Sequence, residues 1–94
     1  MIEKAVWIFS SGGVFPGGIF TTIEKAEKWI KANSLTGVLT QTPLDEGVFD
    51  WALRNNCHNL RPETIAEKSR DPKFIGGFST ASQAHYHYEN GGRA

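Results

Sequence analysis

The segment FTTIEKAEKWIKANSLTGVLTQ, residues 20–41, decides how the rest of the chain must fold. Thr21 and Glu24 have the spacing of a capping box, in which each side chain bonds the backbone N–H of the other residue, so we expect a helix to begin here. Asn33 and Gly37 are typical of a helix end, and the β-prone residues after Gly37 predict a strand. One face of this helix should pack on a core, because apolar residues recur at helical spacing: Ile23, Ala26, Trp29 and Ile30.

The residues on either side of the helix predict strands. Residues 4–9 are apolar at nearly every position, which indicates a strand covered on both faces. A glycine-rich turn at 10–13 leads to a second strand at 14–20, and Pro16 favours an edge position or a bulge because proline has no N–H to donate. A third strand is predicted over 37–42. If strands two and three are parallel, the helix between them makes a right-handed crossover.

The second half of the chain carries weaker signals. A second helix is predicted over 46–55, with Asp45 as its N-cap. Residues 57–71 are equally consistent with a short helix starting at Pro62 and with a surface loop. Residues 73–78 predict a short fourth strand, kinked at its paired glycines.

The C-terminal segment, residues 80–89, has two interpretations. Thr80 and Gln83 have capping-box spacing, which predicts a short helix. Residues 85–88 alternate polar and aromatic side chains, as a strand would. We favour the helix because the start signal is the more specific one, and we expect residues 90–94 to form a flexible tail.

Together these elements predict an α+β fold in a single domain, residues 1–94. A small, mainly antiparallel sheet of about four strands should pack against two main helices, in the order strand, strand, helix, strand, helix, strand, helix. A chain of 94 residues is long enough to build one core without a metal or a disulfide.

The composition narrows the classes of function. Ten basic and ten acidic side chains cancel, whereas nucleic-acid and membrane surfaces select clustered Lys and Arg. We therefore expect neither kind of partner. The longest apolar run, residues 5–9, is too short to cross a bilayer. Cys57 is the only cysteine, so no internal disulfide can form, and we expect a cytoplasmic location.

Histidine and cysteine side chains raise the question of a metal site. On a strand, His85 and His87 would share a face and could both bind a metal ion, whereas on a helix they would point about 160° apart. The predicted helix therefore argues against metal, as does the absence of a CxxC or HExxH motif. Cys57 and His58 are sequence neighbours, which seldom gives a productive nucleophile–base pair. We expect no metal, no cofactor and no catalytic residue.

The aromatic residues near the C-terminus are the more telling functional feature, and they are consistent with a recognition surface or with an ordinary exterior above a buried Tyr88. A short terminal helix cannot bury all of Tyr86, His87 and Glu89, and polar-tipped aromatic residues of this kind are enriched at interfaces. Asp45 and Asp50 add local negative charge at the start of the second helix. We therefore predict that these five residues contact a protein partner, with Tyr86 as the anchor.

The chain as a whole resembles a family of small bacterial domains of unknown function. That family has E-A-E-x-W-I, L-T-G-x-L-T, Y-D-W-A and E-H-Y-H-Y-E motifs. The corresponding segments here are residues 26–30, 35–40, 49–52 and 84–89. Phe49 stands where the family often has Tyr, and Ala84 stands where it often has Glu, which removes a carboxylate from beside the histidines. The resemblance implies a fold but no mechanism.

The leading hypothesis is a protein-binding module, most concretely an immunity-type inhibitor that neutralises a partner toxin. That specific form rests on likeness of size and general style. One alternative is a small metal-binding protein or hydrolase-like enzyme that uses His85, His87 and Cys57. Another is a non-catalytic accessory or oligomerisation domain.

Overall fold

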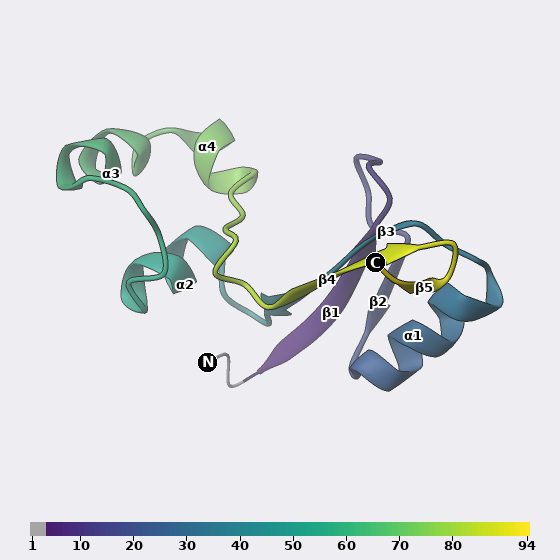
Figure 1. Cartoon of the computed structure of the whole chain (residues 1–94). Coiled ribbons are helices and arrows are strands. Elements are labelled where there is room, and N and C mark those ends of the chain that lie inside the picture. The colour runs from purple at the N-terminus through teal and green to yellow at the C-terminus, as the bar shows by residue number, and fades with distance from the viewer. Residues whose placement is uncertain (1–3) are drawn as a thin grey trace.

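The computed structural model describes residues 4–94 and shows an α+β fold with an antiparallel sheet (Figure 1). The sheet has five strands in the order β2-β1-β3-β4-β5. The strands are β1 (Ala5–Ser10), β2 (Gly18–Phe20), β3 (Gly37–Pro43), β4 (His85–Glu89) and β5 (Gly92–Arg93). The described residues also form four helices: α1 (Ile23–Ala32), α2 (Val48–Arg54), α3 (Pro62–Lys68) and α4 (Pro72–Gly76).

The first half of the chain folds around β1. Strands β2 and β3 both run antiparallel to β1, on its two sides, so they are parallel to each other. Helix α1 therefore carries the chain across β1 from one neighbour to the other, as a crossover requires. It lies on one face of the sheet (Figure 1).

The main core lies between α1 and that face of the sheet. Alternate residues of each strand point into it, because successive side chains in a strand face opposite ways. Trp29 is only half-buried and packs edge-on against Phe9, with ring centroids 5.6 Å apart. The buried residues of this core are Trp7, Phe9, Ala26, Ile30, Leu39 and Tyr88.

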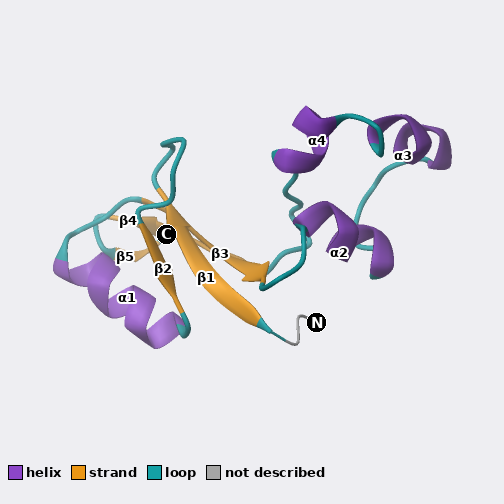
Figure 2. Cartoon of the chain, turned by 180° about the vertical axis from the view of Figure 1, so that it is seen from behind, coloured by secondary structure: helices purple, strands orange, loops and turns teal. Residues whose placement is uncertain are grey.

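Helices α2, α3 and α4 form a second part of the molecule, which we call the helical arm (residues 48–76). It projects from one end of the sheet (Figure 2). Phe49 of α2 is buried and contacts the rings of Phe74 and Phe78, at centroid distances of 5.7 and 5.2 Å. Residues 62–68 and 72–76, all described, include no buried residue.

The N-termini of α1 and α2 differ from the sequence prediction. Thr22, not Thr21, caps α1: its hydroxyl accepts a hydrogen bond from the Lys25 backbone N–H at 3.2 Å. Asp45 does not cap α2, because the chain turns through a positive φ of 61° there and the helix starts after Gly47. Both helices nevertheless lie where the apolar pattern placed them.

The predicted fourth strand at 73–78 is wrong, because residues 72–76 form α4. Asp71 caps this helix: its Oδ1 accepts hydrogen bonds from the backbone N–H groups of Lys73 and Phe74. Pro72 occupies the first turn, where its missing N–H costs nothing. The Asp-Pro start signal outweighs the β-prone residues that follow it.

The predicted C-terminal helix is also wrong, because residues 85–89 form β4. The Thr80–Gln83 contact does form, with the Thr80 N–H donating to Gln83 Oε1 at 3.0 Å, but it closes a turn and no helix follows. The Gln83 side chain is buried and donates through Nε2 to the carbonyl of Gln41. This bond ties the turn to β3, and β4 then pairs along β3.

Residues 90–94, the expected tail, include a short strand, β5. Asn90 and Gly91 both have positive φ, as a two-residue type I′ hairpin turn requires, and β5 returns along β4. The Gly91 N–H also donates to the carbonyl of Leu35, which attaches the turn to the loop between α1 and β3. Asn-Gly is a strong hairpin signal, and the sequence prediction overlooked it.

Candidate binding surface

Strand β4 presents different side chains to the two faces of the sheet. Tyr86 and Tyr88 pair with Leu39 and Gly37 and point toward α1. His85, His87 and Glu89 alternate with them and point the other way, where all three are exposed. The strand therefore places the two tyrosines on one face of the sheet and the two histidines on the other. On a helix these four side chains would be distributed around the axis.

The face away from α1, which we call the open face, combines apolar and polar side chains. Ile19, opposite Ile8 on β1, is 60% exposed. In the part of the chain that the structure describes, no helix lies across this side of the sheet (Figures 1 and 2). The strand register places its central residues together: Ile8, Ile19, Val38, Thr40, His85 and His87.

The loop between β1 and β2, residues 11–17, exposes two large apolar side chains. Val14 is 93% exposed and Phe15 is 83% exposed. Figures 1 and 2 both show this hairpin rising from the sheet on the side away from α1. Large apolar side chains this far from any core are unusual at adjacent positions, and such patches mark contact surfaces.

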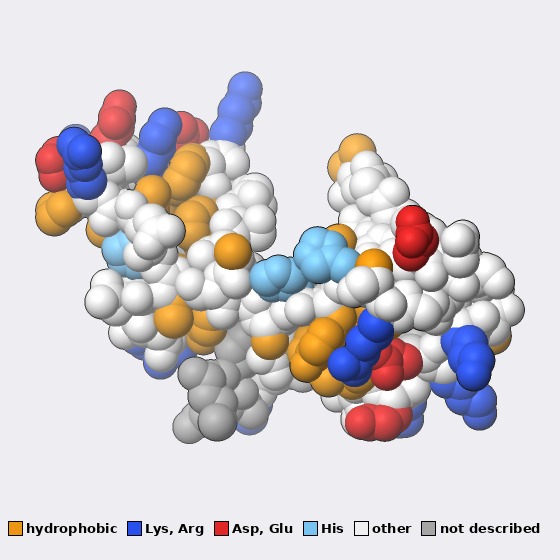
Figure 3. All heavy atoms as spheres, viewed as in Figure 1, with side chains coloured by type: hydrophobic (Ala, Val, Ile, Leu, Met, Phe, Trp, Pro, Cys, Tyr) orange, Lys and Arg blue, Asp and Glu red, His pale blue; other side chains and the backbone are white. Residues whose placement is uncertain are grey.

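The open face is the floor of a hollow. The hairpin stands on one side of it and the helical arm on the other, and histidine side chains over β4 lie between them (Figure 3). The surface is therefore concave along the sheet, with apolar side chains on one wall and imidazole rings on its floor.

The five residues predicted to bind a partner do not form one patch. Tyr86 packs on the α1 side against the ring of Trp7, 5.9 Å away, and beneath the guanidinium of Arg93. His87 and Glu89 lie on the open face. Asp45 and Asp50 are exposed at the arm end of the sheet, whereas Glu89 lies at the other end of β4 (Figure 1).

Tyr86 is therefore part of the packing of the fold. Its ring is half-buried between the core and Arg93, whose guanidinium carbon lies 4.2 Å from the ring centroid. A Tyr86→Ala change would remove these contacts, so its effect on binding could not be separated from its effect on stability.

The cysteine and histidine residues of the alternative hypothesis are only partly brought together. The rings of His85 and His87 lie 5.4 Å apart. Cys57 follows α2 in the arm, where its thiol bonds the Asn55 carbonyl. Across residues 4–94 the structure gathers no group of three or more His, Cys, Asp or Glu side chains that could hold a metal ion.

The sequence profile of the DUF7710 family, a domain of unknown function, matches residues 6–94. The chain belongs to this family. No curated protein and no solved structure matches the chain.

This DUF7710 domain also contains a polar cluster that the sequence prediction missed. Glu27 of α1 accepts a hydrogen bond from the Tyr88 hydroxyl at 2.5 Å and from Arg93 Nε at 2.6 Å. These bonds, the one to Arg93 above all, hold the pKa of the Glu27 carboxyl below its usual range. Burial, helped by the Glu27 carboxylate, raises the pKa of Tyr88 to about 12. The cluster therefore links β4 and β5 to α1.

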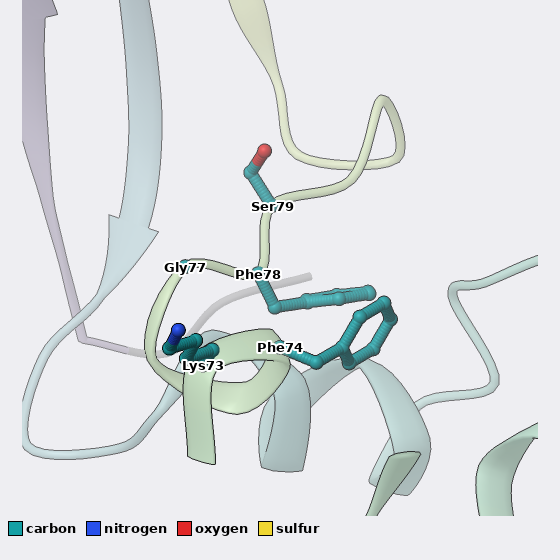
Figure 4. A pocket seen from close by; sticks show the side chains of 5 residues that line it. All are labelled: Lys73, Phe74, Gly77, Phe78 and Ser79. Carbon is teal, nitrogen blue, oxygen red and sulfur yellow. The ribbon is translucent and has the colours of Figure 1, made fainter. Parts of the chain in front are cut away.

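An open pocket of about 360 Å³ lies where the chain leaves the helical arm at the end of α4 (Figure 4). The rings of Phe74 and Phe78 form one side of it, and its remaining lining is Lys73, Gly77 and Ser79. These are few polar groups with which to orient a small molecule, so the pocket carries less functional information than the open face.

No helix among residues 4–94 is long and apolar enough to cross a bilayer.

Proposed function

We propose that this chain is a protein-binding module whose partner docks on the open face and on the hairpin beside it. The observation that carries the proposal is the exposure of Val14 and Phe15, at 93% and 83%, next to an uncovered and partly apolar sheet face. Water leaves such surface favourably when a partner covers it.

The shape and composition of this surface favour a protein over a smaller ligand. Interfaces concentrate their energy in a few anchors that enter pockets of the partner. Phe15 projects from a hairpin and suits that role, and the imidazole rings of the floor can both donate and accept hydrogen bonds. The partner in this proposal has an apolar cavity for Phe15 and polar groups facing His85 and His87.

An immunity-type inhibitor is the most specific form of the proposal. A toxin domain with a basic active site would be attracted by the exposed carboxylates of Asp45, Asp50 and Glu89, because opposite charges raise the rate of encounter. Asp45 follows the end of β3 and Asp50 lies on α2, whereas Glu89 ends β4, so the partner in this form extends along the sheet to reach both groups. Tyr86 no longer serves as the anchor in this form.

Capture from a lysate of the native host tests the proposal. The full chain, immobilised as bait, should retain a specific protein, and Val14→Ser with Phe15→Ser should reduce the retained amount at least tenfold. Leu44→Ser is the matched control, because Leu44 is 47% exposed but follows the end of β3 beside Lys4, at the end of β1 away from the hairpin. Its capture should equal that of the parent.

Melting curves must accompany the capture, so that a variant that unfolds is not scored as one that fails to bind. Equal capture by the parent and by the folded double variant would contradict the proposed surface. Capture of only the chain itself, with a concentration-dependent dimer in light scattering, would contradict a distinct partner and favour the oligomerisation alternative.

A further inference from the structure

Two of the three histidines form a pair on the open face. His85 and His87 are two residues apart on β4, so their side chains leave the sheet on the same side. Their ring centroids are 5.4 Å apart, and both residues are exposed. The pairing depends on the strand, because the same spacing on a helix would separate the two rings.

The orientation of His85 is fixed by its backbone neighbour. Its Nδ1 lies 2.7 Å from the carbonyl oxygen of Gln83. A carbonyl oxygen only accepts, so Nδ1 carries the proton and donates, which leaves the lone pair on Nε2. Metal-binding histidines typically have this arrangement, in which one ring nitrogen donates to a carbonyl or carboxylate and the other binds the metal.

The spacing of the two rings also suits one shared metal ion. Zinc binds imidazole nitrogen at about 2.0–2.1 Å, and two imidazoles in tetrahedral positions then have ring centroids roughly 5 Å apart. The observed 5.4 Å is close to that value. His85 Nε2 is free while Nδ1 keeps its bond to Gln83, and the exposed His87 ring can turn about its side-chain bonds toward that nitrogen.

We propose that His85 and His87 form a bidentate site for a divalent transition-metal ion that prefers imidazole nitrogen, namely Zn²⁺ or Cu²⁺. Copper should bind more tightly than zinc, as the general order of affinities requires. Because residues 4–94 provide no group of three or more candidate ligands, water or groups from another molecule fill the other positions. This inference stands independently of the proposed protein partner.

Calorimetric titration of the untagged full chain with Cu²⁺ or Zn²⁺, in a buffer free of chelators, tests the site. One ion should bind per chain. His85→Ala and His87→Ala should each weaken binding at least tenfold, because each leaves a single imidazole. His58→Ala is the control: His58 accepts a backbone hydrogen bond from Leu60 outside the sheet, and its loss should change the affinity less than twofold.

A rescue experiment distinguishes the strand spacing from histidine content alone. Glu89 lies two residues beyond His87 on the same face, so Glu89→His in the His85→Ala background rebuilds the pair and should recover most of the lost affinity. Glu24→His in the same background is the matched control. Glu24 is exposed on α1, across the sheet, and this change should recover nothing.

Three results would overturn the proposal. The first is a parent chain that shows no saturable binding of either ion below millimolar concentration. The second is a folded His85→Ala, His87→Ala variant that binds as tightly as the parent. The third is equal recovery by Glu89→His and Glu24→His, which would show that any added histidine suffices.

Discussion

The two parts of the molecule use aromatic side chains in different ways. Between the sheet and α1, rings from several strands and from the helix enclose residues with no exposure at all, such as Ile30 and Leu39. In the helical arm, the buried residues Phe49, Trp51 and Ala52 all belong to α2, and the Phe49 ring meets those of Phe74 and Phe78, whereas α3 and α4 contain no buried residue. The first part is a closed core between a sheet and a helix, whereas the buried residues of the second lie on one helix.

This difference indicates where the molecule is most stable. A segment with few buried apolar contacts opens locally at a lower free energy than the global unfolding of the core. The open face belongs to the sheet that α1 supports, so its shape should persist while the arm fluctuates. The arm forms one side of the hollow over the open face and can adjust to a partner without loss of the core.

The largest difference between the two parts should appear on truncating a phenylalanine in each. Phe9→Ala removes a ring that is 1% exposed and should cost about 3–5 kcal/mol of unfolding free energy. Phe74→Ala removes a half-buried ring from the arm and should cost about 1–2 kcal/mol. Urea unfolding of both variants measures this, and an equal loss would show that the arm is as tightly packed as the sheet.

A pair of glycines gives the next contrast. A Cβ at Gly37, where β3 begins, would meet the Ser10 carbonyl and lie 2.7 Å from the Phe9 ring, so Gly37→Ala should destabilise by about 1–3 kcal/mol. A Cβ at Gly76 in α4 would meet nothing within 4 Å, so Gly76→Ala should stabilise by about 0.5–1 kcal/mol. Thermal melts distinguish the two, and loss of stability in both would mean that α4 is more crowded than described.

The polar cluster of the sheet part predicts a specific response to alkaline pH. The pKa of Tyr88 is raised to about 12 in the folded chain and is about 10 when unfolded. The neutral hydroxyl is therefore favoured by folding, and this contribution is lost as the pH rises from about 10 to 12. Absorbance titration of a Tyr86→Phe variant, in which Tyr88 is the one remaining tyrosine, should show ionisation near pH 12. Glu27→Gln should lower the pKa of Tyr88, because it removes the negative charge that disfavours ionisation of the hydroxyl. Ionisation of Tyr88 near pH 10 in a still-folded chain would contradict the cluster.

The smallest effect on stability is expected at the hairpin. Val14→Ser with Phe15→Ser changes side chains that are almost fully exposed, so the free energy of unfolding should stay within about 0.5 kcal/mol of the parent. A larger loss in chemical unfolding would show that these side chains pack against the fold, and would remove the main argument for a binding surface.

The sequence predicted the part of the fold that local patterns determine. Strands β1 and β2, helix α1 and strand β3 lie within a few residues of their predicted positions. The local pattern was sufficient there because the apolar face of α1 and the strands beside it also form the final core. Residues 57–71 are equally consistent with a helix and a loop in the sequence, and within them residues 62–68 form α3 with Pro62 at its start. The shared face of His85 and His87 was also foreseen as a consequence of a strand, although the strand itself was not expected.

The errors lie where a local signal competes with a distant contact. The Thr80–Gln83 spacing is a real capping signal, but Gln83 bonds Gln41, which is 42 residues away, and β4 gains a full ladder with β3. No local pattern reports that partner. The separation of Tyr86 from His87 follows directly from this change, as does the location of the histidine pair. Asn90-Gly91 was a local signal and could have predicted β5.

Native-state hydrogen exchange tests most directly whether the sheet part is the stable platform of the molecule. The amides of β1 and β3 should exchange only through global unfolding. The free energy derived from their exchange rates should therefore equal the free energy of unfolding measured with urea. The amides of α3 and α4 should exchange at least tenfold faster, through local opening of the arm. Uniform protection of both parts, with one exchange free energy throughout, would contradict this account.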